Sequence, residues 1–181
     1  GLVAYWPMEE ADGANRLSQT NTHDLVNFGT VFREANHKEG SFSAGMMADN
    51  YLTNYDAAFR LTNNWAMSTW FLFTNAPGGN DTIISRWGPG ASWLLTIEPL
   101  VGSNVVKFEV TDSGQSPVWV VNSRVSILAS NWYNASYGID GTNVWLQVNN
   151  EARTNSAWTS LFASSDPLGF GYNEILPVGN E

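Results

Sequence analysis

Tryptophan and amide side chains near the turns of this chain could form a carbohydrate-binding site. An aromatic ring offers an apolar platform to a sugar, and neighbouring amide or carboxylate groups can hydrogen-bond its hydroxyls. Trp87 and Trp93 flank the loop of residues 88–90, where a ring could be exposed. The residues predicted to bind ligand are Trp87, Trp93, Asn80, Asp81, Trp119 and Tyr172, with Trp158 as a further candidate.

The opposing interpretation is that tryptophans fill the core, because large aromatic side chains are mostly buried. On this ground we assign Trp6, Trp70 and Trp132 to the core or to packing between strands. Trp145 differs, since it has the opposite parity to the apolar residues on either side of it. We expect its ring to be exposed.

Acidic residues gather in two early turns and could bind calcium, which prefers carboxylate, amide and backbone oxygens. The predicted ligands are Glu10, Asp12 and Asp24 in the first turn and Asp49 in the second. The alternative is that turns favour Asp and Asn for their local hydrogen bonds. No ligand loop of known spacing decides between the two.

Paired carboxylates at strand spacing, which would indicate a glycosidase, are absent from the sequence. Retaining hydrolysis needs two carboxyl groups about 5–5.5 Å apart. Glu98 and Glu109 are single acids, and His23 and His37 lie in loop-like sequence without a serine nucleophile motif. We therefore expect no catalytic activity, and a glycosidase without the usual motif is the weaker alternative.

Charge and composition exclude several classes of function. The chain has 181 residues and a formal net charge of -9, so it lacks the cationic surface that nucleic acid or anionic lipid requires. It contains no cysteine, which excludes disulfides and thiolate chemistry. No stretch is long and apolar enough to cross a bilayer. We expect one domain over residues 1–181, with no nucleic-acid partner and no membrane insertion.

A period of two dominates the chain and predicts an all-β fold. Residues 133–139 and 144–148 alternate around an Asp-Gly turn, the pattern of a hairpin with one buried face. Other predicted strands cover residues 2–6, 26–32, 65–73, 82–86, 92–97, 104–111 and 118–127. Residues 55–61 and 158–163 could form one or two helical turns. Many short strands between Gly and Asn turns indicate a two-sheet antiparallel β-sandwich.

Five segments in order resemble the laminin-G-like, concanavalin-A-like jelly-roll superfamily. They are GLVAYWPMEE, EGSFSAGMMADNYL, WAMSTWFLF, DTIISRWG and NWYNASYGIDGTNVWLQVNN. The resemblance covers roughly residues 2–171 and implies the jelly-roll fold, with calcium bound in many relatives.

Two departures from that family bear on the expectations. Asn134 stands where the family's hairpin often carries His, and no segment matches the family's acidic closing strand. We expect an open sheet edge beside residues 2–6, covered by another chain or by sequence missing from this one.

The combined expectation is a non-catalytic recognition module on a cell, virion or other extracellular surface. Its predicted partner is a glycan, bound by the rim tryptophans with Ca²⁺ as a possible cofactor. The alternative is a structural module, such as a capsid decoration or tail-fibre domain, that binds a surface protein through a strand edge.

Overall fold

The computed structural model describes residues 1–20, 22–47, 50–61, 64–77, 81–86, 92–111, 118–158 and 165–171. Within this part of the chain the regular structure is almost entirely β, with a single short 3-10 helix, η1 (Ala57–Phe59). The strands are β1 (Val26–Phe28), β2 (Phe32–Glu34), β3 (Ser43–Gly45), β4 (Tyr51–Asn54), β5 (Trp65–Phe71), β6 (Thr82–Arg86), β7 (Trp93–Leu100), β8 (Ser103–Thr111), β9 (Val118–Ser126), β10 (Tyr133–Asp140), β11 (Asn143–Val148), β12 (Thr154–Ala157) and β13 (Leu168–Phe170).

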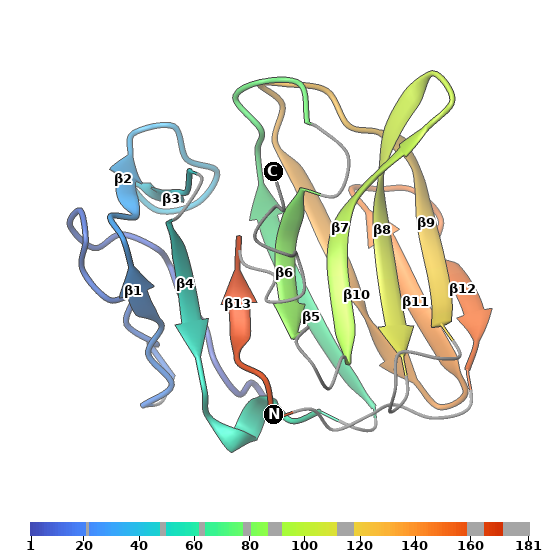
Figure 1. Ribbon diagram of the computed structural model, residues 1–181, viewed down its shortest axis with the longest axis horizontal. Coiled ribbons are helices and arrows are strands. Elements are labelled where there is room, and N and C mark those ends of the chain that lie inside the picture. The colour runs from blue at the N-terminus through green and yellow to red at the C-terminus, as the bar shows by residue number, and fades with distance from the viewer. Residues whose placement is uncertain are drawn as a thin grey trace, which may run out of the picture.

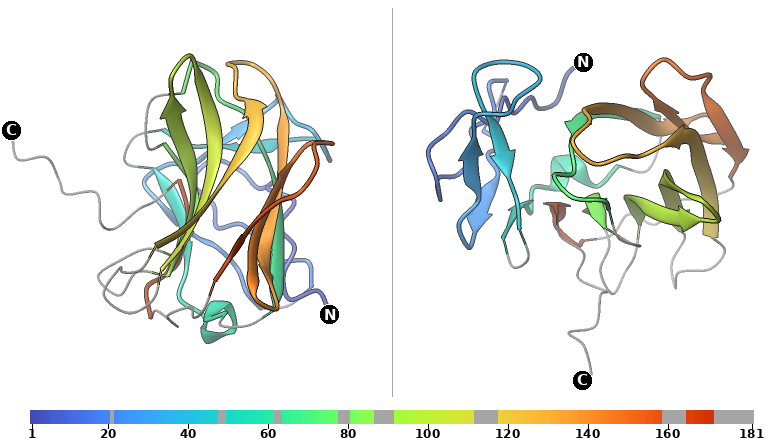
Figure 2. Two further views of the ribbon diagram at one scale, coloured as in Figure 1. Left: turned by 90° about the vertical axis from the view of Figure 1, so that its right-hand side faces the viewer. Right: turned by 90° about the horizontal axis from the view of Figure 1, so that it is seen from above.

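Two antiparallel sheets form the body of the molecule (Figure 1). The larger has seven strands in the order β1-β4-β13-β6-β7-β8-β9, and the smaller has four in the order β12-β11-β10-β5. The side view in Figure 2 shows the strands β7–β9 and β10–β12 as two separate layers. The prediction of a two-sheet antiparallel β-sandwich is confirmed.

A third, two-stranded sheet pairs β2 with β3. This hairpin lies beside β1 and β4, at the left of Figure 1. The eight residues between its strands, 35–42, form a loop that becomes important below.

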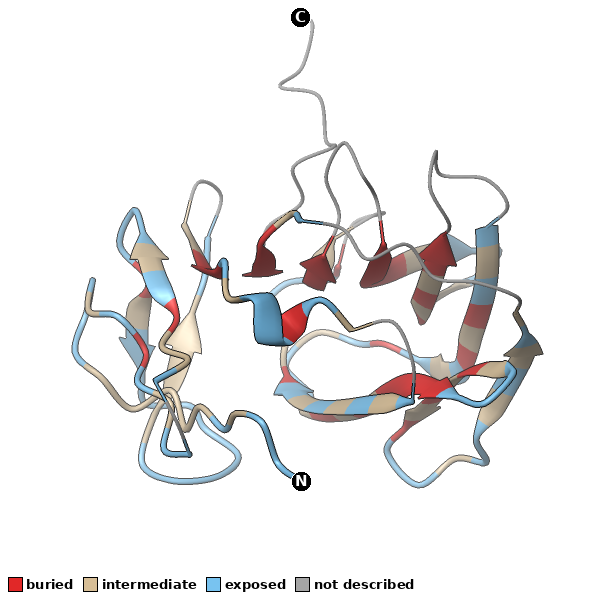
Figure 3. Cartoon of the chain, turned by 90° about the horizontal axis from the view of Figure 1, so that it is seen from below, coloured by how far each residue is buried: buried red, intermediate tan, exposed pale blue. Residues whose placement is uncertain are grey.

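Apolar side chains from the inner faces of both sheets meet between the layers. Trp93 and Phe108 of the large sheet contact Trp65 and Tyr137 of the small one, with ring centroids 5.0–6.0 Å apart. Burying each of these side chains contributes roughly 2–3 kcal/mol. Figure 3 shows buried and exposed residues alternating along the strands, as expected when each sheet has one inner face.

The hairpin predicted at residues 133–148 is present as β10 and β11. Its register pairs Asp140 with Asn143 and Tyr137 with Leu146. Gly141 has a φ of 59°, which the tight turn requires and which glycine adopts at low cost. The predicted short helical turn in residues 55–61 is also present, as η1.

The prediction of a strand at residues 2–6 was wrong. Their backbone makes isolated hydrogen bonds instead of a ladder, with Gln19 N donating to Tyr5 O over 2.9 Å. Trp6 packs on Phe59 and Phe170 and donates its Nε1–H to His23 O. The apolar alternation thus reflects side-chain packing of an irregular segment. The edge strands of the two main sheets are β1, β9, β12 and β5, so the open edge is not where the sequence placed it.

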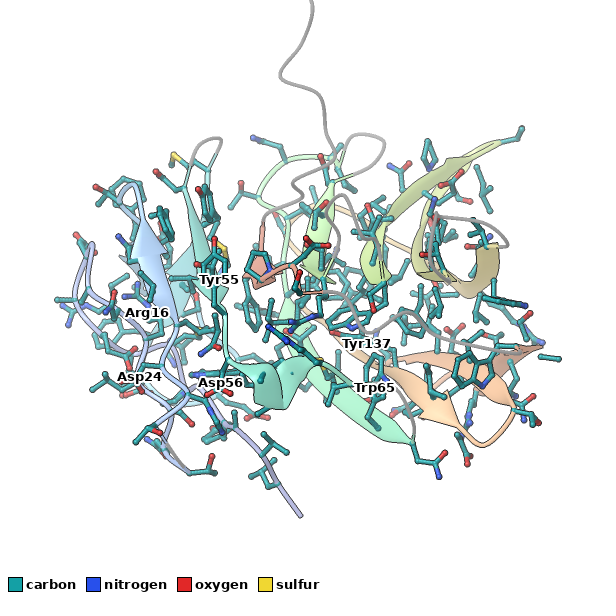
Figure 4. The ribbon with its side chains drawn as sticks, turned by 60° about the horizontal axis from the view of Figure 1, so that its bottom comes forward. Arg16, Asp24, Tyr55, Asp56, Trp65 and Tyr137 are labelled. Carbon is teal, nitrogen blue, oxygen red and sulfur yellow. The ribbon has the colours of Figure 1, made fainter. Side chains whose placement is uncertain are left out.

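Arg16 organises the irregular N-terminal segment. Its guanidinium is fully buried and donates to the backbone oxygens of Ala11, Ala14 and Val31. Its backbone forms an isolated bridge with Leu25. Burial lowers the pKa of Arg16, and the charges of the nearby acidic groups partly offset that effect. Figure 4 shows Arg16 in this segment, away from Trp65 and Tyr137 in the main body.

Candidate functional site

The outer face of the four-stranded sheet combines tryptophan with amide and hydroxyl side chains. It is built by residues of outward parity on β5, β10, β11 and β12: Ala66, Ser68, Trp70, Asn134, Ser136, Gly138, Trp145, Gln147, Asn155 and Ala157. We call this set the outer face. Its strands carry their large apolar residues on the opposite parity, so the sandwich core forces these polar residues outward.

An open depression with a volume of about 410 Å³ lies at one end of the outer face. It is lined by Lys38, Trp70, Trp132, Asn134, Asn149 and Asn150. Four elements meet there: the end of β5, the start of β10, the turn after β11 and the loop of residues 35–42. The lining therefore offers two indole rings beside three amide side chains, the combination expected of a sugar-binding surface.

The loop of residues 35–42 fixes both indoles. Trp70 donates its Nε1–H to Glu39 Oε1 over 2.9 Å, and Trp132 donates its Nε1–H to Asn36 Oδ1 over 3.0 Å. Lys38 Nζ lies 5.0 Å from the centroid of the Trp70 ring. Because their N–H groups are already bonded, the rings are held in place before any ligand arrives, which lowers the entropy cost of binding.

The loop itself is fastened to the N-terminal segment. Glu9 Oε1 accepts a hydrogen bond from Ser41 N over 2.6 Å, and the same carboxylate packs directly on Gly40. At the start of β3, Ser43 donates its hydroxyl to Asn36 O in the loop. Residues distant in sequence from β5 and β10 therefore determine where the exposed indoles sit.

A hydrogen-bond network orients the polar groups next to Trp70. Asn134 Nδ2 donates to Ser68 Oγ over 3.1 Å, and Ser136 Oγ lies 3.2 Å from the same oxygen. The backbone N–H of Asn134 donates to Asn149 Oδ1 over 2.9 Å. These side chains are aligned by one another, and hydroxyl and amide groups so arranged keep further bonding capacity for sugar hydroxyls.

The outer face has one more tryptophan, Trp145, at the end away from the depression. Trp145 on β11 is half-buried, and the guanidinium of Arg153 lies 4.3 Å from its ring centroid. Arg153 is held by Asp140 Oδ2 at 3.1 Å and by Asn155 Oδ1 at 2.8 Å. Trp145 has the outward parity that the sequence indicated, but its ring is half-buried rather than exposed.

The tryptophans chosen from the sequence are mostly in the wrong place for a sugar platform. Trp93 is 0% exposed in the centre of the core, so it cannot stack on a ligand. Trp119 lies on the inner parity of β9 and packs edge-on against Trp158, with centroids 6.5 Å apart. Asp81 is half-buried, and its backbone oxygen accepts a hydrogen bond from Ile97 N. Trp87, Asn80 and Tyr172 lie outside the described residues.

Two tryptophans assigned to packing, Trp70 and Trp132, instead form the depression. The assignment was wrong for Trp70, which is 37% exposed on the outer parity of β5. The signal was present in the sequence, since Trp70 shares its parity with Ser68 and Ala66 while Trp65, Met67 and Phe71 share the other. Trp6 does pack against the core, as expected.

The acidic residues predicted to bind calcium are used by the loops that contain them. Glu10 accepts from Leu17 N, Asp12 from Arg33 N and Asp24 from Ser18 N, over 2.7, 2.7 and 2.9 Å. Among the described residues no group of three or more Asp, Glu or His side chains is arranged to hold a metal. These contacts fit the turn interpretation better than a shared cation. Asp49 lies outside the described residues, and calcium binding stays a prediction.

Glu98 and Glu109 face one another across a lysine on the large sheet. Lys107 Nζ lies 2.9 Å from Glu98 Oε2 and 3.1 Å from Glu109 Oε2. Partial burial would lower the pKa of Lys107, but its hydrogen bonds to the two carboxylates outweigh that and raise it. The two acids thus form an ion-pair cluster with a basic residue at its centre.

Comparison with known proteins supports the fold. The sequence matches no family model and no curated protein. Among solved structures, the chain is similar to domain 4 of AbnA, a GH43 extracellular arabinanase from Geobacillus stearothermophilus, in complex with arabinotriose. The TM-score is 0.61 at 14% identity, covering 81% of this chain and 68% of that one. This likeness shows a shared β-sandwich.

The described part of the chain has no helix with the length and hydrophobicity of a membrane span.

Proposed function

We propose that this chain is a non-catalytic carbohydrate-binding module that binds glycan on the outer face of its four-stranded sheet. The observation that carries the proposal is the depression where Trp70 and Trp132 are fixed beside Asn134, Asn149 and Asn150. A pyranose or furanose ring has apolar faces and a polar rim, and this surface complements both. The similar sandwich domain was solved with arabinotriose, which supports a glycan as the class of ligand.

The chain would work outside the cell or on its surface, where polysaccharides are found. Its laminin-G-like segments and its similarity to a domain of an extracellular enzyme both support that location. A neutral amide surface needs no cation to bind sugar hydroxyls, so we propose that binding does not depend on calcium.

The test is affinity electrophoresis of the purified chain in gels containing arabinan, xylan, mixed-linkage glucan or mannan, with calcium and with chelator. We expect retardation by at least one neutral polysaccharide, unchanged by chelator. Trp70→Ala should remove most of the retardation. Tyr55→Ala is the matched control, because Tyr55 is also an exposed aromatic residue, at 64%, but is not part of the outer face.

Two results would contradict the proposal. Equal retardation of wild type and Trp70→Ala would place binding elsewhere, and retardation that chelator abolishes would restore a calcium site. No retardation in any gel would favour the alternative of a structural module. Exposed apolar residues at the β7–β8 turn and after β9, Leu100, Val101 and Leu128, are where such a module would contact a protein neighbour.

A further inference from the structure

The two indoles of the outer face stand at opposite ends of a diagonal. Trp70 on β5 pairs with Asn134, and Trp145 on β11 pairs with Gly138, four residues further along β10. A strand rises about 3.3 Å per residue and neighbouring strands lie about 4.8 Å apart, so the two positions are about 16 Å from one another. One sugar ring cannot touch both.

Neutral hydrogen-bonding groups fill the strip between the indoles. Ser136 is the outward residue of β10 midway along the diagonal, and it pairs with Ser68 on one side and Gln147 on the other. All three side chains can donate and accept hydrogen bonds. Uncharged hydrogen-bonding side chains therefore connect Trp70 with Trp145.

Gly138 keeps the far end of the strip low. It occupies an outward position between Ala66 and Trp145, where any other residue would carry a side chain. Its backbone also approaches Trp65 O so closely that a Cβ atom there would collide with that oxygen. Gly138 is itself buried, and it adds no side chain beside Trp145 on this face.

From this geometry we infer that the outer face binds an extended, uncharged glycan chain lying along the diagonal, with Trp70 and Trp145 contacting different sugar units. The inference rests on the proposed function and adds the form of its ligand, the interior of a linear polysaccharide rather than a terminal sugar. Arg153 covers part of the Trp145 ring and is held by Asp140 and Asn155. Its position limits the ligand to the part of the Trp145 ring that Arg153 leaves free.

The test is isothermal titration of the full chain with linear arabino-, xylo- and cello-oligosaccharides of two to eight units. For the series that binds, affinity should rise with the length of the oligosaccharide and level off once it contacts both Trp70 and Trp145. Losing one aromatic contact costs about tenfold in affinity. Trp145→Ala should therefore weaken the six-unit ligand about tenfold and leave the two-unit ligand within about twofold, whereas Trp70→Ala should weaken both.

Two control variants separate the loss of the Trp145 ring contact from a general loss of folding. Trp145→Phe retains an aromatic ring and should keep the six-unit affinity within about threefold. Val120→Ala changes an exposed side chain on β9 of the other sheet and should leave all affinities unchanged. Equal affinity for two and six units, or no effect of Trp145→Ala, would overturn the inference while leaving glycan binding intact. No binding by any series or polysaccharide would overturn both.

Discussion

Arg16 shows how one residue can maintain a segment that has little regular structure. Its guanidinium donates to the carbonyls of Ala11, Ala14 and Val31, and two of these, Ala11 O and Val31 O, also accept backbone hydrogen bonds from Ala14 N and Gly13 N. A buried carbonyl without a donor is costly, and so is a buried charge without partners. Arg16 therefore links residues 11–16 to the start of β2.

Replacing Arg16 with methionine keeps much of the side-chain volume and removes the donors. We expect the free energy of unfolding to fall by about 2–4 kcal/mol, because three hydrogen bonds from a buried guanidinium are lost. Urea denaturation followed by tryptophan fluorescence measures the change. Arg124→Met is the control, since Arg124 is exposed on β9, and it should alter stability by no more than about 0.5 kcal/mol. Equal effects for the two variants would contradict this role for Arg16.

Asp56, at the start of η1, makes the free energy of unfolding depend on pH. Its carboxylate accepts from Ala58 N and lies 2.7 Å from His23 Nδ1, and both contacts lower its pKa from the ordinary value of 3.8. A lowered folded pKa contributes stability that is present above pH 3.8 and is lost as the pH falls through the folded pKa.

Asp56→Asn should retain the cap and lose the ionisation, because asparagine also accepts a hydrogen bond at a helix N-terminus. The difference in unfolding free energy between wild type and Asp56→Asn should be constant at neutral pH and shrink below pH 3.8. Chemical denaturation at a series of pH values measures it. A difference that does not vary with pH would show that the charge contributes nothing.

At the scale of elements, the loop of residues 35–42 positions side chains that belong to other strands than those of its own hairpin. The hairpin β2–β3 is short, yet its loop supplies Asn36 and Glu39 as acceptors for the indoles of the depression. Its position depends on Glu9, which packs on Gly40. A change within the loop should therefore lower the affinity for glycan.

Gly40→Ala tests this dependence. Gly40 has a φ of 71° and its added Cβ would meet the Glu9 carboxylate, so either the loop shifts or Glu9 moves away and gives up its hydrogen bond to Ser41 N. We expect glycan affinity to fall roughly threefold to tenfold as the indoles lose their fixed positions. Gly13→Ala is a matched control, with a φ of 68° and its nearest neighbouring atom 4.0 Å away, and it should lower stability without lowering affinity. Affinity that falls equally in both variants would attribute the effect to backbone strain alone.

The elements that the sequence predicted well are those whose alternation is enforced by a buried face. Residues 133–148 show one apolar parity and an Asp-Gly turn, and they form β10 and β11 as expected. Residues 2–6 show similar alternation because Ala4 and Trp6 pack against the core, but none of the described strands pairs with them. Periodicity records which side chains are buried and does not say what buries them.

The site was harder to predict than the fold. Trp93 and Trp70 both alternate with smaller residues, and the choice between them depended on which parity faces the second sheet. That is a property of the assembled sandwich. The contribution of Asn36 and Glu39 could not be read from the sequence at all, since it depends on contacts between residues as far as 96 positions apart.

At the scale of the whole molecule, charge selects among glycans. The net charge of -9 repels polyanions, while the depression is lined by neutral side chains and one lysine. We expect a neutral polysaccharide to bind with an affinity that changes less than about twofold between 50 mM and 500 mM NaCl, because an uncharged ligand makes no charge–charge contact for salt to screen. Polygalacturonate should not bind. Titration calorimetry at both salt concentrations checks this, and strong salt dependence would assign the main role to Lys38 or Arg153.

The alternation of β5, β10 and β11 has a consequence for how this surface could be altered. Trp65, Met67 and Tyr137 hold the two layers together, while Ser68, Ser136 and Gln147 on the same strands point to solvent. The two sets share a backbone but lie on opposite faces of the sheet. A library randomised at Ser68, Ser136 and Gln147 could therefore be selected for new sugars without redesigning the interior, which would make the sandwich a scaffold for engineered glycan reagents.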